Sequence, residues 1–370
     1  MGGTAMRFFK KLLLDGQSEW FYQLPMEFTK YSDKNVLRYC VGAALYMPAT
    51  RKVIAQEIIA HKHPTCTTII LDLEDALGDL QVGDGEKQLY ETLYELQNAL
   101  DNQLIEIQDM PLLFVRVRDA AQLEKIIHLL GSLQHVITGY VLPKFNTKQG
   151  HHYLQQIATQ NTLGYTLYAM PIIESQAIMK TESRIGELLA IRTLLEQFEP
   201  LVLNVRIGST DICGWLGLRR SIHQTVYDLV PVQNCLSDII NVFLRDNSPF
   251  VLSGSVWEYF GNDAALKGLV REIELDKLNG LIGKTIIHPS HIDSVQAMYV
   301  VTHEEFSDAK RIVLQSVGEI GVEKSIYSNK MNEMKPHFVW AERMLLRAQV
   351  YGVLNPEYSS EHLLKRPVEV

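Results

Sequence analysis

Charged side chains recur at the ends of short apolar runs along the sequence. The residues placed in this way are Asp72, Glu74, Asp75, Arg116, Arg118, Lys144, Glu174, Asp211, Lys284 and His288. Taken singly, each is explained as well by a solvated or ion-paired surface loop. Their repetition carries more weight, because carboxylates and cations that converge on one site are what metal-assisted chemistry on an anionic substrate requires.

Glu174 and Asp211 have the side chains that a hard divalent cation selects. Mg²⁺ prefers oxygen ligands, takes one or two carboxylates from the protein, and leaves its other positions to water and substrate. A cation held there would polarise a carbonyl group and stabilise the negative charge of an enolate. Arg116 can clamp a carboxylate with two parallel hydrogen bonds. We therefore predict Arg116, Glu174 and Asp211 as catalytic residues, with Mg²⁺ or another divalent cation bound by the two carboxylates.

Four further charged residues are predicted to bind substrate. Glu74 and Asp75 follow Asp72, and at least one of these three carboxylates is expected to hold an arginine or a lysine. Lys144 fits a contact with the substrate, and a structural ion pair explains it equally well. Arg51 suits a phosphate or a carboxylate group. The sequence does not identify the general base, because a neighbouring subunit can supply such a group.

The apolar runs before these residues have the character of buried parallel strands. Short β-branched or apolar runs alternate with segments of helical periodicity, which is typical of strands joined by crossover helices. The expected strands are Val41–Met47, Thr67–Leu73, Leu112–Val117, Thr138–Leu142, Thr166–Pro171, Leu201–Ile207, Phe250–Leu252 and Leu281–Ile287. The expected helices are Glu86–Leu100, Ala120–Leu133, Gln149–Gln160, Ser183–Gln197 and Val232–Arg245. This alternation predicts an α/β chain with a closed (β/α)8 TIM barrel, whose active site lies at the carboxyl ends of the strands.

The predicted barrel occupies residues 41–306, between an N-terminal extension at 1–40 and a C-terminal helical extension at 307–370. Apolar and aromatic positions from Ser307 to Gly352 have helical spacing. This extension is interpreted as a helix that closes the bottom of the barrel, as a subunit contact, or as a part of the catalytic site.

The composition excludes several classes of function. The net charge is -8 and the pI is about 5.9, whereas a general binder of nucleic acid or anionic membranes needs a concentrated basic face. The cysteines are Cys40, Cys66, Cys213 and Cys235. Because they have no CxxC spacing, we expect no disulfide framework, no zinc knuckle and a reducing cytoplasmic location. A metal site at His61, His63 and Cys66 is disfavoured, because no fourth ligand follows at a suitable spacing.

Seven short motifs occur in the order that is found in a known family. They are LYMPATR at Leu45–Arg51, LDLEDAL at Leu71–Leu77, FVRVR at Phe114–Arg118, VLPK at Val141–Lys144, PIIES at Pro171–Ser175, RIGSTDICGWLG at Arg206–Gly217 and GKTIIHPSHI at Gly283–Ile292. Each motif is weak alone, but the common order makes the match specific. In these motifs the sequence resembles the citrate lyase β-subunit and malyl-CoA lyase group of the HpcH/HpaI aldolase class.

This resemblance implies a metal-dependent TIM-barrel lyase or aldolase, usually with magnesium, that assembles as a homo-oligomer, a trimer or a hexamer. By position in the motifs, it implies that Arg116 binds substrate and that Glu174 and Asp211 are metal ligands. Two departures lie beside the metal segments: Thr210 stands where the family often has Glu, and Gln176–Ile178 replaces Ala-Arg-Gly. The long N-terminal stretch and the helical tail resemble the divergent branch associated with tellurite resistance and stress.

The predicted function is a carbon–carbon bond lyase or aldolase that acts through a metal-stabilised enolate. Its substrate is expected to be a small carboxylate-bearing hydroxy acid, either free or joined to CoA or a carrier as an acyl thioester. One alternative is a thioester hydrolase or phosphoenolpyruvate-type enzyme on the same site. The other is a non-catalytic barrel scaffold, which the retained carboxylates and arginine disfavour. Neither a nucleic acid nor a membrane is expected as a partner.

Overall fold

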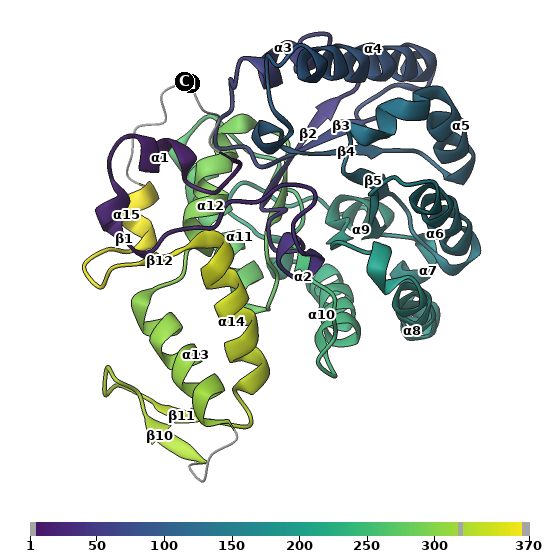
Figure 1. Cartoon of the computed structure of the whole chain (residues 1–370). Helices are drawn as coiled ribbons and strands as arrows, with labels where there is room; N and C mark the ends of the chain where they lie inside the picture. The colour runs from purple at the N-terminus through teal and green to yellow at the C-terminus, as the bar shows by residue number, and fades with distance from the viewer. Residues whose placement is uncertain (1–4, 317–320, 365–370) are drawn as a thin grey trace.

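Eight parallel strands form a barrel that is surrounded by helices (Figure 1). The structure is a computed structural model that describes residues 5–316 and 321–364. The barrel strands are β2 (Ala43–Pro48), β3 (Thr68–Asp72), β4 (Leu112–Arg116), β5 (Gly139–Leu142), β6 (Tyr168–Ile173), β7 (Val205–Ile207), β8 (Leu252–Ser253) and β9 (Lys284–Ile286). Each of them overlaps one of the predicted runs, so the predicted TIM barrel is confirmed.

Backbone hydrogen bonds between residues in or just after β8 and residues just before β9 bring the two ends of the sheet together. The strands are arranged in the order β8-β7-β6-β5-β4-β3-β2-β9, so sequence neighbours lie side by side from β2 to β8. At the two ends of this order, Ile282 N donates to Leu252 O (2.7 Å) and Gly254 N donates to Gly283 O (2.9 Å). Every residue of β3, β4 and β5 is buried, as expected for strands with helices on one side and the barrel interior on the other.

Helices connect the strands and cover the outside of the barrel (Figure 1). They are α3 (Ile54–Ile59), α4 (Val82–Asp101), α5 (Ala120–Leu130), α6 (Thr147–Thr162), α7 (Gln176–Met179), α8 (Thr181–Gln197), α9 (Ser209–Trp215), α10 (Val230–Leu244), α11 (Asp263–Leu278) and α12 (Ile292–Tyr299). The predicted helices correspond to α4, α5, α6, α8 and α10. α3 has six residues and α4 has 20, so α3 covers a much shorter length of the barrel wall. Within the described ranges, no helix is long and apolar enough to cross a membrane.

The carboxyl ends of the strands form the mouth of the barrel. The sequence analysis placed Lys284 among the charged residues there, but the structure places it elsewhere. It is the first residue of β9, and its side chain is fully buried. Its Nζ lies 3.0 Å from Glu272 Oε1 and 2.7 Å from Asp276 Oδ2, both on α11. The position at the start of the strand, rather than after it, directs Lys284 to α11, where the pair of carboxylates satisfies its charge.

The N-terminal and C-terminal segments pack against each other (Figure 1). β1 (Phe21–Gln23) pairs antiparallel with β12 (Val353–Leu354). The Phe8 ring stacks on the ring of Tyr351 with centroids 4.2 Å apart. Short helices α1 (Lys10–Leu14), α2 (Lys34–Leu37) and α15 (Ser360–Leu364) complete these segments. The division of the chain at residues 40 and 306 stays a prediction.

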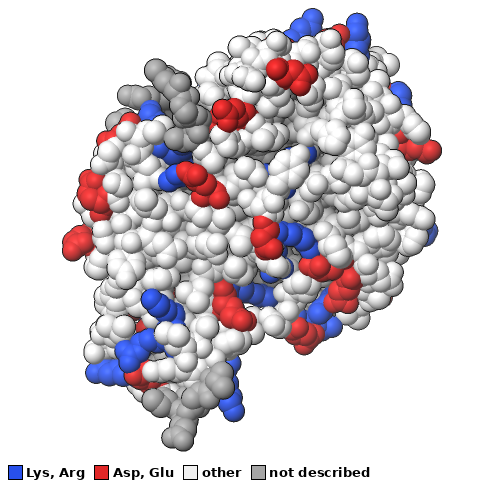
Figure 2. Space-filling view, in the orientation of Figure 1, with Lys and Arg blue, Asp and Glu red and all other residues white. Residues whose placement is uncertain are grey.

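The C-terminal extension is mostly helical, as predicted, but it also contains a β-hairpin. Its main helices are α13 (His303–Gln315) and α14 (Phe338–Tyr351). Between them, β10 (Val322–Lys324) pairs antiparallel with β11 (Met331–Glu333). On the face shown in Figure 2, the acidic and basic side chains of the described residues are interspersed.

His291, just after β9, makes the stability of the fold depend on pH. The side chain is 4 % exposed, its Nε2 donates to Tyr259 O (3.0 Å), and its Nδ1 has no partner. Burial lowers the pKa of His291 from 6.5 to about 4. Since the unfolded state then binds more protons, stability is full above pH 6.5 and falls as the pH drops toward 4. The loss amounts to about 2 kcal/mol at pH 5.

His291→Gln should remove this dependence, because glutamine keeps a donor for Tyr259 and does not titrate. Urea unfolding of both proteins at pH 7 and pH 5 measures the effect. We expect the wild type to lose about 2 kcal/mol more than the variant between the two pH values. Equal losses in the two proteins would show that His291 accepts a proton in the folded state.

Candidate functional site

Arg116 is held at the barrel mouth by Asp72 on the neighbouring strand. The two residues end β4 and β3 and face each other in the register of the sheet. Nε and Nη2 of Arg116 each donate to one oxygen of Asp72, both at 2.6 Å. Burial disfavours the charge of Arg116, but the hydrogen bonds to Asp72 raise its pKa, so it stays cationic. The expectation that a carboxylate of the Asp72 segment holds an arginine is therefore confirmed.

Glu74, Asp75 and Lys144 lie on the open side of Arg116. Nη1 of Arg116 is 3.0 Å from Glu74 Oε2 and 3.2 Å from Asp75 Oδ2. Lys144 Nζ donates to Glu74 Oε1 and lies 3.7 Å from Asp75 Oδ1. Glu74 is buried, whereas the side chain of Asp75 is 54 % exposed. The structure thus brings these predicted residues together around one arginine.

Glu174 and Asp211 form a second pair of carboxylates in the same mouth. Glu174 follows β6 and is 4 % exposed, and Asp211 lies in the first turn of α9 after β7. Their side chains share a hydrogen bond. Burial, and then the charge of Asp211, raise the pKa of Glu174 to about 8. Glu174 is buried and Asp211 is partly buried, so their proximity favours protonation of one of them unless a cation neutralises the pair.

Two backbone features keep Glu174 in this position. The N–H of Lys144 donates to Glu174 Oε1 (3.0 Å), and Lys144 has a left-handed backbone with φ of 48°. Such a backbone is uncommon for a residue other than glycine, and it often occurs at functional sites. A Cβ on Gly208 would lie 1.7 Å from Glu174 Oε2, so only glycine leaves room for the carboxylate.

The donor set in the mouth fits a hard divalent cation. Asp72, Glu74, Asp75, Glu174 and Asp211 carry more negative charge than Arg116 and Lys144 neutralise. In the described part of the chain, no group of three or more His, Cys, Asp or Glu side chains could hold a metal ion. Two carboxylates are nevertheless what Mg²⁺ usually takes from a protein. Burial and the charge of Asp211 disfavour the ionised form of Glu174, and a cation bound at this pair would favour that form.

Tyr46 and Arg206 are candidate site residues that the sequence analysis did not identify. Tyr46 lies on the inner face of β2, 5.0 Å from the guanidinium of Arg116 and 6.0 Å from that of Arg206, measured to its ring centre. Arg206 is 1 % exposed, hydrogen-bonds the Tyr46 hydroxyl and donates to Thr285 Oγ1 (2.6 Å). Its Nε has no partner. Burial lowers the pKa of Arg206, but a guanidinium remains charged in proteins.

Arg51 and the Arg219-Arg220 pair lie outside this cluster of contacts. Arg51 forms an ion pair with Glu57 on α3, so its predicted contact with substrate stays a prediction. Arg220 is buried, donates to Val256 O, and lies 5.1 Å from the ring of Trp257. Arg219 is exposed and lines a cavity of about 310 Å³ on the side of α9 that carries Ser209 and Cys213.

Comparison with known proteins shows which family the chain matches. Residues 35–353 match the family described as C-C bond lyase of the TIM-barrel fold. No curated protein matches the chain. A citrate lyase from Burkholderia xenovorans LB400 is 15 % identical with a TM-score of 0.63, and the match covers 88 % of this chain and 96 % of that one.

A second solved structure has a similar fold. It is the CitE protein of Mycobacterium tuberculosis, solved in complex with magnesium, acetoacetate and coenzyme A. It is 20 % identical with a TM-score of 0.55, and the match covers 84 % of this chain and 99 % of the CitE chain. At these identities the likeness concerns the fold, and the resemblance to the stress-associated branch stays a prediction.

Proposed function

The chain belongs to the C-C bond lyase family of the TIM-barrel fold, and from this we propose that it breaks or forms a carbon–carbon bond beside the carboxylate of a small hydroxy acid, with a divalent cation as cofactor. The observation that supports this most directly is the pair formed by the buried Glu174 and the partly buried Asp211 beside Arg116. Membership of a lyase family argues against the alternatives of a hydrolase and of a non-catalytic scaffold.

Glu174 and Asp211 would hold the cation, and Mg²⁺ is the ion that we propose. The oxygen donors of both residues, together with the burial and the raised pKa of Glu174, support this assignment. The magnesium in the M. tuberculosis CitE complex agrees with it. The chemistry that such an ion supplies is the stabilisation of negative charge on a carbonyl oxygen of the substrate.

Arg116 and Lys144 would bind the substrate carboxylate. Arg116 is fixed by Asp72 through Nε and Nη2, so its Nη1 is the nitrogen that faces the open mouth. Asp75, which is more than half exposed, is the partner that an incoming carboxylate can replace at this nitrogen. A charge-assisted hydrogen bond to a fixed guanidinium orients the substrate without a further loss of side-chain freedom.

Tyr46 would donate a hydrogen bond to a substrate oxygen. Because Arg206 donates to its hydroxyl oxygen, the hydroxyl hydrogen of Tyr46 is left to point into the mouth. The buried charge of Arg206 polarises this donor and has no carboxylate within ion-pairing distance among the described residues. A fixed donor aimed at developing negative charge lowers the barrier most in a site that excludes water.

Tyr46→Phe is expected to lower kcat about 100-fold and to change KM much less, because the donor matters most when negative charge develops. Steady-state kinetics with a turned-over hydroxy acid measures both constants. Tyr140→Phe is the matched control, because Tyr140 is buried in β5 and donates to Gln134 Oε1 (3.1 Å) outside the mouth. An unchanged kcat in Tyr46→Phe would remove Tyr46 from the proposed chemistry.

The proposed function is tested by calorimetric titration of the wild-type protein with oxalate, with and without Mg²⁺. Oxalate mimics the planar dianionic enolate of pyruvate. We expect binding only when Mg²⁺ is present, because the acidic mouth repels a free dianion. Magnesium-dependent binding would justify a screen of 2-oxo and hydroxy acids. Absence of binding under both conditions would contradict a pyruvate-type lyase.

A further inference from the structure

The inner face of β9 continues into the mouth of the barrel at Ile287. Thr285 of β9 accepts a hydrogen bond from the buried Arg206, so its side chain points into the barrel interior. Lys284, which precedes it, points outward to α11. Because side chains alternate between the two faces of a strand, Ile287 lies on the same inner side as Thr285. It is the first residue after β9.

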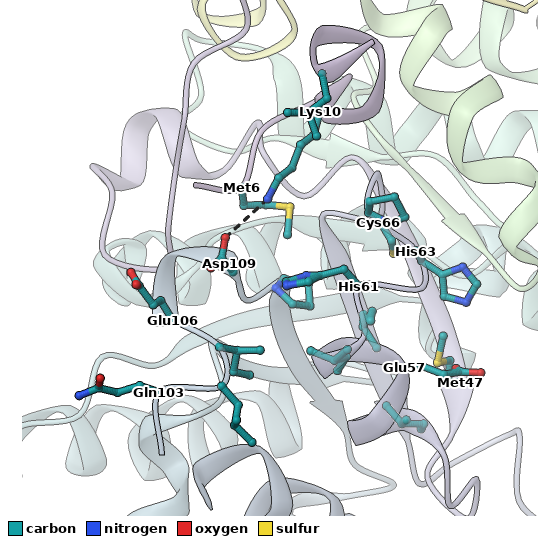
Figure 3. Close-up of a pocket in the computed structure, with 18 residues that line it drawn as sticks. Met6, Lys10, Met47, Glu57, His61, His63, Cys66, Gln103, Glu106 and Asp109 are labelled. Carbon is teal, nitrogen blue, oxygen red and sulfur yellow. Dashed lines mark ion pairs between the residues drawn. The ribbon is translucent and has the colours of Figure 1, made fainter. Parts of the chain in front are cut away.

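Tyr46 and Pro48 of β2 lie on the inner side for the same reason. Met47, between them, lines a cavity of about 400 Å³ on the outer side of the wall, together with residues of α3 (Figure 3). The neighbours of an outward-facing residue in a strand face inward. The ring of Tyr46 lies 5.0 Å from the guanidinium of Arg116 inside the mouth, in agreement with this alternation.

Ile287 and Tyr46 are neighbours on this inner face. β2 and β9 run parallel and pair Leu45 with Ile286. The next residue of each strand is Tyr46 in β2 and Ile287 after β9, and residues at equal steps along a parallel pair stay side by side. Ile287 therefore lies beside the hydroxyl-bearing ring that is proposed to contact the substrate.

An apolar surface lies open in this part of the mouth. Ile287 is 45 % exposed, and Pro48 is exposed as well. The ring of Phe260, which is 51 % exposed, stacks on the ring of His288, the residue after Ile287, with centroids 4.3 Å apart. Apolar side chains that are exposed at a concave site gain free energy when an apolar group covers them.

The charged side chains of the mouth come from the other part of the ring. They follow β3 to β7, whereas Pro48 ends β2 and Ile287 follows β9. The carboxylates described above outnumber the cations of the mouth, which are Arg116, Lys144 and Arg206. On the connection after β2, Arg51 is already paired with Glu57 of α3. A second carboxylate on a substrate would therefore meet an apolar surface and net repulsion.

We propose that the substrate is a monocarboxylic acid with an apolar tail, and that Ile287 selects this tail. The inference rests on the proposed function, because Arg116 and a cation must hold the carboxylate end. With that end fixed in the charged part of the mouth, the rest of the substrate extends past Tyr46 toward Ile287. An alkyl or aryl tail loses contact with water there, and a tail that ends in a second carboxylate is disfavoured.

The test compares the binding of 2-oxobutyrate, 2-oxo-4-methylpentanoate and 2-oxoglutarate to the full-length protein by calorimetric titration with Mg²⁺ present. These acids share one head group and carry a short, an apolar and an anionic tail. We expect 2-oxo-4-methylpentanoate to bind about 10-fold more tightly than 2-oxobutyrate, because it buries two further carbon groups. 2-Oxoglutarate should bind no more tightly than 2-oxobutyrate.

The possible results separate this inference from the proposed function. If 2-oxoglutarate binds as tightly as 2-oxo-4-methylpentanoate or more tightly, the inference is overturned, while the binding itself still supports a site for a cation and a carboxylate. If none of the acids binds, both proposals are overturned. Binding is measured without turnover, so the result does not depend on the identity of the natural substrate.

Ile287→Lys tests whether Ile287 contacts the tail. Lysine removes apolar surface and adds a cation, so 2-oxo-4-methylpentanoate should bind about 10-fold more weakly and 2-oxoglutarate about 3-fold to 5-fold more tightly. Misfolding would weaken the binding of both acids. Ile185→Lys is the matched control, because Ile185 is 46 % exposed but lies on α8, outside the barrel. It should keep the wild-type order of affinities, and the same order in Ile287→Lys would contradict the role of Ile287.

Discussion

Glu174→Gln is expected to abolish the magnesium-dependent binding of oxalate and to lower the rate of carbon–carbon cleavage at least about 1,000-fold. Glutamine keeps the size of the side chain and one oxygen, but it removes the negative charge. Asp211 would then face the cation alone, and the buried amide would compete poorly with water for it. Calorimetric titration and single-turnover kinetics measure the two losses. Asp211→Asn should have the same effect, since both carboxylates are proposed to hold one ion.

Glu86→Gln is the control for these variants. Glu86 is about as buried as Glu174, at 5 % against 4 % exposed, and it accepts hydrogen bonds from Gln122 and Lys125 away from the mouth. It should keep both the binding and the activity of the wild type. A Glu174→Gln protein that binds Mg²⁺ and oxalate normally would remove the proposed cation site.

The second large effect is expected for Arg116→Lys, which should lower kcat/KM about 100-fold to 1,000-fold. Lysine keeps the charge, but it cannot donate to both oxygens of Asp72 and still present a nitrogen to the substrate. Asp72 is 1 % exposed, so the lost hydrogen bond also costs about 2 kcal/mol of stability. Steady-state kinetics and urea unfolding measure the two effects.

Arg192→Lys is the control, because it tests whether replacing any largely buried arginine by lysine lowers kcat/KM. The side chain of Arg192 is 13 % exposed, and it donates to Glu196 and to Val242 O on the outer helices. Its replacement should leave kcat/KM unchanged. If Arg116→Lys also kept the kcat/KM of the wild type, the guanidinium would have no role in the reaction beyond its charge.

The barrel and most of the mouth were predictable because of how parallel strands are buried. Strands covered on both faces form continuous apolar runs, and the first polar residues after them mark the carboxyl ends. Asp72, Arg116 and Glu174 stand at such ends, and the pairing of adjacent strands then brings them together. The resemblance to a known family added the order of the motifs.

Tyr46 and Arg206 were not predicted for a different reason. In a strand that is buried on both faces, apolarity does not distinguish the side that faces the barrel interior from the side that faces the helices. Tyr46 therefore looked like any other apolar residue of its run, and Arg206 like part of a motif.

Lys284 was expected at the mouth although it begins its strand, and α11 was missed because Glu272 and Asp276 interrupt its apolar face. The structure explains these two buried carboxylates, because both form ion pairs with Lys284.

The pairing of β1 with β12 has a consequence for how the protein is made in a cell. Gln23 Nε2 donates to Ala348 O across 325 residues of sequence. A ribosome that adds about 5 to 20 residues per second needs roughly 15 to 65 s to produce the partner of the N-terminal segment. The barrel strands all leave the ribosome earlier, while Phe8 still lacks Tyr351. During this interval the nascent chain presents an uncovered aromatic surface, which is the kind of surface that chaperones bind during translation.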